Sequence, residues 1–334
     1  MNDLNFKIEI MKAAVYYENG GPEVFRYQDV QDPVYKQNQV LISIKSISIE
    51  GGDLINREMR PLIQIPNIVG YQCAGEIIAV GSDVEDRFIG QRVVTLGNSG
   101  SHAQLIAVDN FRTFPIPDGL SFEEASAIPV TFLTARDCLF TSGNLKDKET
   151  VLIHGGTGSL GLAAIQMASM AGAVVIATGS DETKLKKLTD FGATHLINYK
   201  TQDIVKEVLE VTGNLGANLV IDSVGGKNLS ISAEALAYRG RIAFVGLSSR
   251  DASLFDPFLL WKQNSTLHGV FLPGITEVEK TKTADALKSI FEDVVSGKLK
   301  VTIDKVFPLS QAREAHQYVG ERKGFGRVLL DPEL

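Results

Sequence analysis

The stretch GTGSLG, residues 156–161, has the residue types and the spacing of a phosphate-binding turn. It matches G-x-G-x-x-G, follows the apolar run VLIH and opens the run SLGLAAIQMA, so it predicts a strand, a tight turn and a helix. In such a turn Gly156 permits the bend, Gly158 lets the backbone approach a pyrophosphate, and Gly161 lets the helix pack closely on its strand. The pyrophosphate then lies on N–H groups at the helix N-terminus. We therefore predict a dinucleotide site, formed by Gly156, Thr157, Gly158, Ser159, Leu160 and Gly161. The alternative is a glycine turn in another kind of α/β protein.

The stretch ATGSDETK, residues 177–184, bears on the choice of dinucleotide. A carboxylate after this second strand would bind the adenosine ribose and repel a 2′-phosphate. Here Ser180 is neutral and can donate to a phosphate oxygen, and Lys184, one helical turn later, supplies positive charge. Asp181 is expected to cap the next helix with its own carboxylate. The stretch favours NADPH. The alternative is that Lys184 is an ordinary solvated helix lysine with no role in cofactor binding.

The expected secondary structure that positions these residues changes along the chain, from short strands to alternating strands and helices. Up to about residue 130, short β-branched runs at 40–49, 75–81 and 91–97 are bounded by turn residues, and the first long helix is expected at 121–140. From there to GRIAFVG at 240–246, strands alternate with helices, which predicts βαβ units and a parallel sheet. The end of the chain returns to mixed structure and is expected to pack back on the first domain.

Composition excludes several classes of partner. A chain of 334 residues can form two domains, and its net charge of −7 gives no attraction for nucleic acid or anionic lipid. No apolar run approaches the ~20 residues of a bilayer span. The N-terminus lacks a signal-peptide pattern, so we expect the cytoplasm, with residues 1–10 as a loose extension. Cys73 and Cys138 have no metal or disulfide spacing and are expected to be reduced and buried.

From Met11 onward the chain resembles the medium-chain dehydrogenase/reductase superfamily, in its zinc-independent quinone oxidoreductase (zeta-crystallin-like) branch. The resemblance is carried by KAAVYYENGGPEVF, IVGYQCAGEIIAVG, IPDGLSFEEASAIP, FLTARDCL, VLIHGGTGSLGLAAIQMA, FGATHLINY and GFGRVLL. It implies an α/β protein in two parts: a GroES-like β-rich catalytic domain, residues 11–134 together with 272–334, and a Rossmann doubly wound parallel-sheet domain, residues 135–271. It also implies NADPH as the cofactor.

The zinc ligands of related alcohol dehydrogenases have no counterparts in the matching positions. Those enzymes carry a Cys three residues before an Asp, where this chain has Glu50 before Asp53. They carry Gly-His-Glu where this chain has Gly70, Tyr71 and Gln72, and the four cysteines of their structural-zinc lobe are missing. A catalytic zinc needs about three protein ligands plus water, and the five histidines show no metal spacing. We therefore expect no zinc.

Without a Lewis acid, the favoured substrates are those that delocalise negative charge after a hydride arrives, such as quinones and α,β-unsaturated carbonyls (enones). The resemblance implies a cleft between the domains lined by Tyr71, Gln72, Glu50, Asn56 and Arg57. Tyr71 is expected to hydrogen-bond the substrate carbonyl, or else only to fill the volume that zinc vacated. Arg57 either faces the substrate or pairs structurally with Asp53 or Glu50.

The resemblance also implies residues that contact the cofactor. Tyr199 is expected beside Ser180 and Lys184 at the 2′-phosphate. Near the nicotinamide we expect Thr134, Gly246, Leu247 and, through its backbone, Phe271; Arg327 is expected to reach the cofactor phosphates from the returning tail. For these last five residues a core or surface role is the alternative, and for His102 a packing role is preferred.

Two other functions remain open at this point. An enoyl-thioester (enoyl-CoA) reductase would need a proton-donating Tyr-Pro, but the corresponding residues, Met59 to Pro61, contain no Tyr, so water is expected to deliver the proton. The other is a non-catalytic, crystallin-like NADPH-binding protein; a net charge of −7 argues against RNA binding. The resemblance also suggests a homodimer joined through the strand near TLHGVF, residues 266–271.

Overall fold

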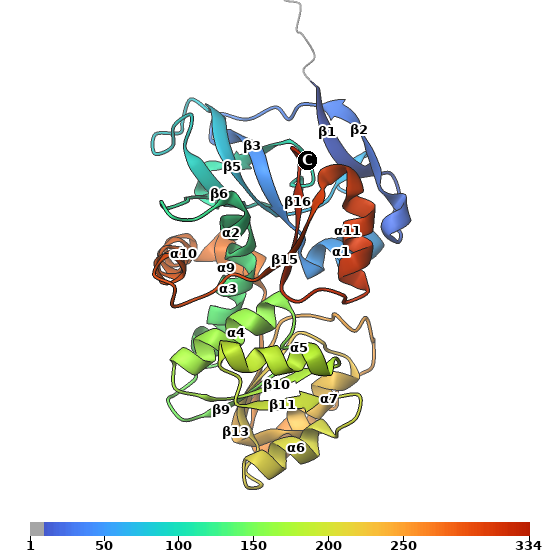
Figure 1. Ribbon diagram of the computed structural model, residues 1–334, viewed down its shortest axis with the longest axis vertical. Helices are drawn as coiled ribbons and strands as arrows, with labels where there is room; N and C mark the ends of the chain where they lie inside the picture. The colour runs from blue at the N-terminus through green and yellow to red at the C-terminus, as the bar shows by residue number, and fades with distance from the viewer. Residues whose placement is uncertain (1–9) are drawn as a thin grey trace, which may run out of the picture. The chain divides into compact units, whose positions relative to one another are not determined.

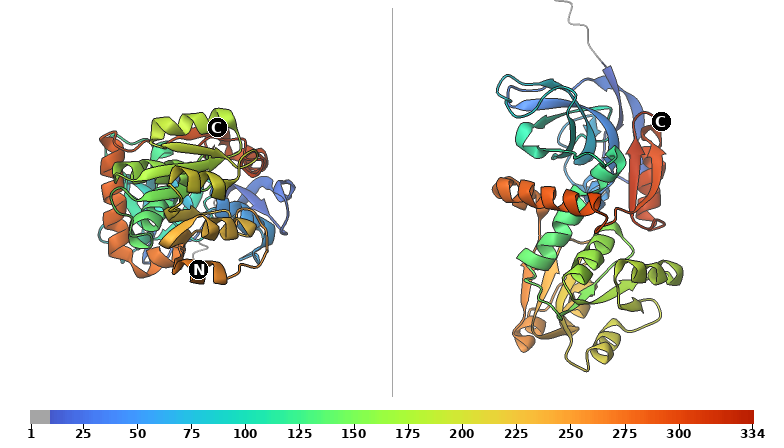
Figure 2. Two further views of the ribbon diagram at one scale, coloured as in Figure 1. Left: turned by 90° about the horizontal axis from the view of Figure 1, so that it is seen from below. Right: turned by 60° about the vertical axis from the view of Figure 1, so that its left-hand side comes forward.

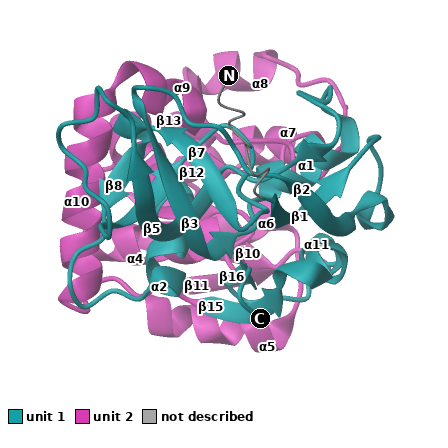
Figure 3. Ribbon diagram, turned by 90° about the horizontal axis from the view of Figure 1, so that it is seen from above, with its two compact units in different colours: residues 1–130, 303–334 teal, residues 131–302 magenta. Residues whose placement is uncertain are grey.

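The computed structural model describes residues 10–334 and divides the chain into two compact units (Figure 3). Unit 1 contains the chain up to Val130 together with Ile303–Leu334, and unit 2 contains Thr131–Thr302. Most of the expected loose extension, residues 1–9, lies outside the described residues, and Ile10 already begins the first strand. Within residues 10–334, no helix combines the length and apolar character that a bilayer span requires.

Unit 1 is built from two β-sheets (Figure 1). The smaller sheet has the order β2-β1-β4, and the larger has the order β15-β16-β3-β5-β6-β8, with β7 paired to β3. Its strands are β1 (Ile10–Tyr16), β2 (Arg26–Gln31), β3 (Gln39–Ser48), β4 (Asn67–Ile68), β5 (Gln72–Val80), β6 (Arg92–Leu96), β7 (Leu105–Asp109), β8 (Thr113–Pro115), β15 (Ile303–Pro308) and β16 (Arg327–Asp331). Its helices are α1 (Gly51–Met59), α2 (Phe122–Ala127) and α11 (Ala312–Gly320), with short 3₁₀ turns at Pro22–Val24, Asn110–Arg112 and Leu309–Gln311.

The strands expected at 40–49, 75–81 and 91–97 are β3, β5 and β6. Along most of β3, buried and partly buried residues alternate, as in a strand with one face on a core. Its Ile42, Ile44 and Ile47 are fully or almost fully buried, together with Leu330 of the returning tail. Burial of each such side chain stabilises the fold by ~1.5–3 kcal/mol.

Unit 2 is a six-stranded, wholly parallel sheet in the order β11-β10-β9-β12-β13-β14 (Figure 1). Its strands are β9 (Thr150–Ile153), β10 (Val174–Gly179), β11 (His195–Asn198), β12 (Ala217–Asp222), β13 (Leu236–Phe244) and β14 (Thr266–Gly269). In chain order this is 3-2-1-4-5-6, the doubly wound Rossmann order. The prediction of an α/β fold with a GroES-like β-rich part and a Rossmann sheet is confirmed.

Helices cover both faces of this sheet (Figure 2). Those that pack on its strands are α4 (Ser159–Met170), α5 (Glu182–Lys187), α6 (Ile204–Val211), α7 (Lys227–Glu234) and α8 (Phe258–Gln263). Unit 2 also contains α9 (Leu272–Val278), α10 (Lys280–Val295) and a 3₁₀ turn at Leu188–Phe191. The single helix expected at 121–140 is instead three segments: α2, α3 (Pro129–Arg136) and a π-helical turn at Asp137–Thr141. Because proline has no N–H and clashes with the preceding turn, Pro129 can begin a helix but cannot continue one.

The boundary expected at residue 272 differs from the observed division, in which α9, α10 and the segment up to Thr302 belong to unit 2. Gln166 of α4 explains the attachment of this segment, because its amide bonds both backbone groups of Lys300, at 3.1 Å to the carbonyl oxygen and 2.8 Å from the nitrogen. The tail packs on unit 1 only from Ile303, where β16 pairs antiparallel with β3.

Candidate dinucleotide and substrate sites

The glycine-rich turn joins β9 to α4, as the sequence predicts, but the structural roles of its individual glycines differ from those expected. The left-handed backbone conformation falls on Gly155 (φ 66°), one residue before the motif. Gly156 is needed for space, since a Cβ there would lie 2.9 Å from Leu188 Cδ1 and 3.0 Å from Ala177 Cβ. At Gly161 a Cβ would lie 2.5 Å from the Gly155 oxygen, so close packing of α4 on the turn does require glycine.

A buried hydrogen-bond chain lies beneath this turn. The Ser232 hydroxyl donates to Asp222 at 2.7 Å and lies 3.1 Å from His154 Nε2. Because that hydroxyl already donates its proton, His154 Nε2 must carry a proton, and Nδ1 can accept from Thr178 Oγ1 at 3.4 Å. Thr178 Oγ1 also accepts from the Gly155 N–H at 3.3 Å. Burial lowers the pKa of His154, so the ring stays neutral and the chain holds the turn in place. Sequence reasoning missed these residues: His154, Thr178 and Asp222 are marked only by their position at strand ends, and Ser232 lies within α7.

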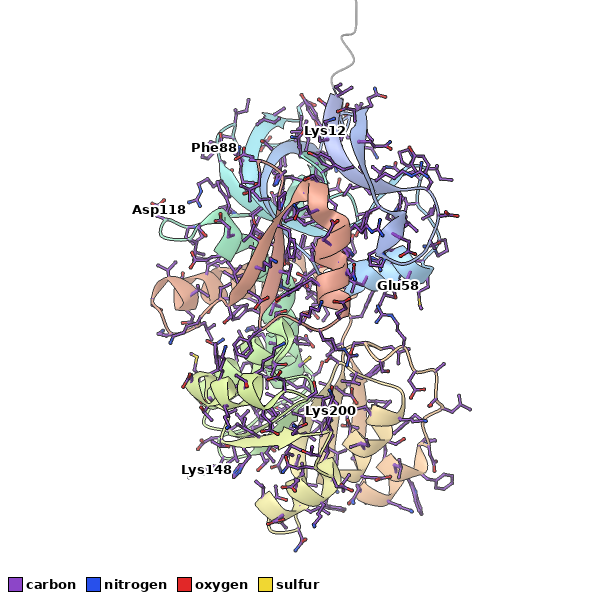
Figure 4. All side chains as sticks on the ribbon, turned by 45° about the vertical axis from the view of Figure 1, so that its right-hand side comes forward. Lys12, Glu58, Phe88, Asp118, Lys148 and Lys200 are labelled. Carbon is purple, nitrogen blue, oxygen red and sulfur yellow. The ribbon has the colours of Figure 1, made fainter. Side chains whose placement is uncertain are left out.

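Ser180, Lys184 and Tyr199 follow the neighbouring strands β10 and β11. Gly179 pairs with Asn198, and the Tyr199 N–H donates to the Gly179 oxygen at 3.1 Å, so Ser180 and Tyr199 begin adjacent turns. Lys200, labelled in Figure 4, comes next in the turn after β11. Asp181 caps α5 as predicted, since its Oδ1 accepts the Lys184 N–H at 2.9 Å, and backbone hydrogen bonds lower its pKa.

These residues also lie next to the glycine-rich turn. A Cβ at Gly179 would be 3.4 Å from Thr157 Cγ2, which joins the end of β10 to the motif. Unit 2 therefore places the phosphate turn beside the ends of β10 and β11, from which Ser180 and Tyr199 follow, an arrangement that fits a dinucleotide.

The residues predicted for the nicotinamide are spread over three elements of unit 2. Thr134 is buried on α3. Gly246 and Leu247 lie in the loop after β13, which continues beside the loop after β12 through a 3.2 Å bond from the Ser248 N–H to the Ser223 oxygen. Phe271 is exposed before α9, and its carbonyl accepts from the N–H groups of Gly274 and Ile275, so only its N–H could contact a carboxamide.

In unit 1, the Tyr71 side chain packs against the first turn of α1. A Cβ at Gly52 would lie 2.6 Å from the Tyr71 hydroxyl, and the Gly52 backbone hydrogen-bonds that oxygen. Burial, then the charges of Asp53 and Glu50, raise the pKa of Tyr71 well above 10. Tyr71 is partly exposed. The phenol therefore stays protonated and can donate a hydrogen bond.

Arg327 lies in the interior of unit 1. Its Nη1 lies 2.7 Å from Glu50 Oε2 and donates to the Ile49 oxygen at 2.8 Å. Glu50 Oε1 accepts from the Ser48 hydroxyl at 2.9 Å and from Gln72 Nε2 at 3.2 Å. Burial raises the pKa of Glu50 and the Arg327 charge opposes that shift. The geometry thus gives Arg327 a structural partner in Glu50.

Gln72 and Arg57 are also committed to the interior. Gln72 is fully buried, its amide donates to Ser126 O and Glu50, and its oxygen accepts from the Val130 N–H at 2.6 Å. Arg57 is 1% exposed and donates to the Gly20 oxygen at 3.1 Å, to His316 Nδ1 at 2.8 Å and to Glu58 at 3.0 Å. These hydrogen bonds of Arg57 and Gln72 hold α1 and β5 in place within unit 1.

Arg57 also fixes the protonation of two buried histidines. Arginine only donates, so His316 Nδ1 accepts and its Nε2–H donates to His102 Nε2 at 2.9 Å. Burial, then the neighbouring charges, lower the pKa of His316, and burial lowers that of His102 to about 3. His102 also stacks on Phe25 with ring centroids 6.3 Å apart, which agrees with its preferred packing role.

The fold and these sites define a two-part dinucleotide-dependent oxidoreductase class, and comparison with known proteins agrees. Residues 36–118 match the alcohol dehydrogenase GroES-like domain, and residues 159–289 match the zinc-binding dehydrogenase domain. The quinone oxidoreductase of Sus scrofa is 31% identical, with 96% of this chain and 98% of that protein covered. The chain belongs to the medium-chain dehydrogenase/reductase superfamily, in its quinone oxidoreductase branch.

Two further relatives and one solved structure are also similar to this chain. A 2-haloacrylate reductase of a Burkholderia species is 30% identical over 97% of this chain and 100% of its own length. The synaptic vesicle membrane protein VAT-1 homolog of Danio rerio is also 30% identical, and the match covers 90% of this chain but only 66% of that protein. The structure of Escherichia coli quinone oxidoreductase complexed with NADPH superposes with a TM-score of 0.92 at 28% identity, over 96% of this chain and 100% of that one.

The zinc named by the domain description finds no fitting donor set in the part of the chain described. No three His, Cys, Asp or Glu side chains gather within residues 10–334. At the positions matching zinc ligands, the Glu50 carboxylate is paired with Arg327 and the Gln72 amide is hydrogen-bonded at both ends. Neither is a typical zinc donor in that state.

Two alanine substitutions should separate the roles of the glycines. In Gly161→Ala the new Cβ meets backbone atoms, so α4 must shift, and we expect a loss of ~1–3 kcal/mol in unfolding free energy. In Gly158→Ala the nearest atom is 3.4 Å away and φ is −83°, so stability should change by less than ~0.5 kcal/mol while dinucleotide affinity falls, because the methyl occupies the pyrophosphate's approach. Urea unfolding and nucleotide titration measure the two effects. Unchanged stability in Gly161→Ala, or unchanged affinity in Gly158→Ala, would contradict this division.

Proposed function

We propose that this protein is an NADPH-dependent reductase of quinones or other α,β-unsaturated carbonyls that works without zinc. The observation that carries the proposal is the pairing of Glu50, at the position of a zinc ligand, with Arg327, beside a protonated Tyr71 held on the first turn of α1. A site of this kind offers a hydrogen-bond donor in place of a Lewis acid. Substrates that delocalise negative charge over a conjugated system are those that need no metal.

Tyr71 acts in this proposal as a donor that orients the substrate carbonyl. Because the Gly52 backbone bonds its oxygen, the hydroxyl proton is left to point at an acceptor. The partial positive charge of the α1 N-terminus favours negative charge developing nearby. A phenol with a pKa well above 10 donates a hydrogen bond but gives up its proton reluctantly, so water remains the proposed proton source.

The other residues of α1 and β5 have secondary roles. Asn56 is partly exposed and lies four residues after Gly52, on the same face of α1, so it is proposed as a second polar contact for the substrate. Arg57 and Gln72, predicted as catalytic, are proposed here as positioning residues because their polar groups are already bonded.

The cofactor is proposed to lie along the β-strand ends of unit 2. When bound, NADPH supplies the hydride. Gly156–Gly161 would hold its pyrophosphate, and Ser180, Lys184 and Tyr199 its 2′-phosphate; Thr134, Gly246, Leu247 and the Phe271 N–H are proposed for the nicotinamide side. The Escherichia coli enzyme complexed with NADPH supports this choice, as does the lack of an acidic residue directly after β10.

The relatives support the substrate class in different ways. Quinone oxidoreductases act on quinones, and the name 2-haloacrylate reductase describes reduction of a conjugated carboxylate. Enoyl-thioester reduction remains the alternative, together with a non-catalytic NADPH-binding role, and both are tested by NADPH oxidation with a quinone, a short enone and an enoyl-CoA.

Replacing Tyr71 tests the donor. Tyr71→Phe should lower kcat/KM by about ten- to a few hundred-fold, the loss of one hydrogen bond worth ~1.5–3 kcal/mol, with NADPH binding intact. Tyr238→Phe, an exposed tyrosine of unit 2, is the control. An unchanged rate in Tyr71→Phe would leave that side chain a space-filling role.

The purified protein should contain far less than one zinc per chain. Stoichiometric zinc that is lost together with activity on chelation would overturn the zinc-free mechanism.

Replacing Lys184 and Ser180 tests the cofactor. Lys184→Ala removes a charge-assisted contact worth ~1.5–3 kcal/mol, so the Kd for NADPH should rise roughly ten- to a hundredfold while that for NADH barely moves. Ser180→Asp adds repulsion against the phosphate and a ribose acceptor that NADH can use. Equal affinity of the wild type for NADH and NADPH, or an equal loss of affinity for both in Lys184→Ala, would contradict the assignment of Ser180 and Lys184 to the 2′-phosphate.

A homodimer is proposed through β14, the edge strand of the unit 2 sheet. All four β14 residues are exposed, as are Phe258 and Trp261 of α8, so an unpaired strand edge and apolar surface remain to be covered. Light scattering should give twice the 36.2 kDa chain mass. Leu267→Lys should shift the mass toward the monomer, whereas Phe88→Lys in unit 1 should not. A monomeric wild type at micromolar concentration would refute the interface.

A further inference from the structure

Two carboxylates directly follow the proposed 2′-phosphate site, and each is held by a specific hydrogen bond. Asp181 is occupied at the start of α5, where its Oδ1 accepts the Lys184 N–H. Glu182, the next residue, is exposed, and its Oε1 accepts from Asn198 Nδ2 at 2.5 Å. The acidic group that the second strand lacks at its end is therefore present two residues after Ser180, bound to the neighbouring strand.

Asn198 is a rigid anchor for this bond. It is the last residue of β11, it is 6% exposed, and it pairs with Gly179 of β10. Its backbone N–H donates to Gln202 Oε1 at 2.8 Å, and its side-chain oxygen accepts the Lys200 N–H at 3.1 Å. With the amide oxygen fixed in this way, the amide nitrogen is directed at Glu182.

The position of the Glu182 carboxylate matters because of what a carboxylate does near an adenosine ribose. Such a group accepts from the ribose hydroxyls of NADH and repels the 2′-phosphate of NADPH. An exposed glutamate has several rotamers, and a short bond to a charged acceptor restricts them. Tethering Glu182 to the end of β11 thus removes it as a ribose acceptor.

We propose that Asn198 is a specificity-determining positioning residue, which keeps Glu182 tethered and thereby preserves the preference for NADPH over NADH. This inference rests on the proposed NADPH dependence and adds a residue that contacts neither the phosphate nor the ribose.

The test compares Kd values for NADPH and NADH, measured by fluorescence titration without substrate, in the wild type and four variants. Asn198→Ala should weaken NADPH binding roughly five- to twentyfold and leave NADH binding unchanged or tighter, because an added carboxylate repels the phosphate across partly aqueous surroundings. Glu182→Gln should bind NADPH at least as tightly as the wild type. The double variant Asn198→Ala with Glu182→Gln should recover the wild-type NADPH affinity, which a purely structural role for Asn198 would not allow.

The fourth variant is a matched control. Gln202→Ala removes the side-chain acceptor of the Asn198 backbone N–H while leaving the Asn198–Glu182 pair, and its NADPH-to-NADH ratio should equal that of the wild type. A ratio unchanged in Asn198→Ala, or a double variant that fails to recover, would overturn this inference while the NADPH preference of the wild type stands. A wild type without that preference would overturn the proposed function itself.

Discussion

The buried ion pair between Glu50 and Arg327 is the interaction on which the organisation of unit 1 depends. Two charges with almost no exposure to water must satisfy one another, because removing either partner leaves the other unpaired at a cost of ~3–5 kcal/mol. The pair joins the residue before α1 to the first residue of β16, and a bond to Ile49 extends the same link. It therefore fixes the returning tail and the start of α1 together, and the Tyr71 hydroxyl packs on the turn that begins there.

A comparable constraint operates in unit 2, where parallel strands bring all their carboxyl ends to one edge. The glycine-rich turn, the end of β10 and the end of β11 become neighbours for this reason alone. Side-chain hydrogen bonds then fix the backbone at this edge. The chain through Ser232, His154 and Thr178 holds the Gly155 N–H. Asp181 accepts the Lys184 N–H, and Asn198 donates its side-chain amide to Glu182. The polar groups at this edge are thus largely preorganised before any ligand binds.

The proposed function combines the chemistry of the two units. It assigns a dinucleotide phosphate to the glycine-rich turn of unit 2, and it assigns to Tyr71 of unit 1 the role of a neutral donor at a helix N-terminus. Three other polar residues of unit 1 form hydrogen bonds or ion pairs that stabilise the fold: Arg57, Gln72 and Arg327. In the proposed function, preorganisation of a single donor, whose pKa is kept high by burial and then by neighbouring carboxylates, suits substrates that carry their own electron sink.

The sequence by itself determined the β-rich part, the Rossmann alternation, the phosphate turn and the Asp181 cap, because each rests on local spacing: period, glycine position, or an acid before a helix. The break of the expected 121–140 helix at Pro129 is also local in origin, since it follows from proline's missing N–H. The sequence could not determine that Gly155 rather than Gly156 takes the left-handed conformation, or that residues 272–302 stay with unit 2. Those outcomes depend on contacts between distant segments, such as Gln166 with Lys300. The roles of Arg57, Gln72 and Arg327 were likewise decided only by tertiary structure, since burial and the choice of partner, Glu50 for Arg327 and His316 for Arg57, arise across more than 250 residues of chain. A polar side chain in a sequence motif has no fixed partner until folding supplies one.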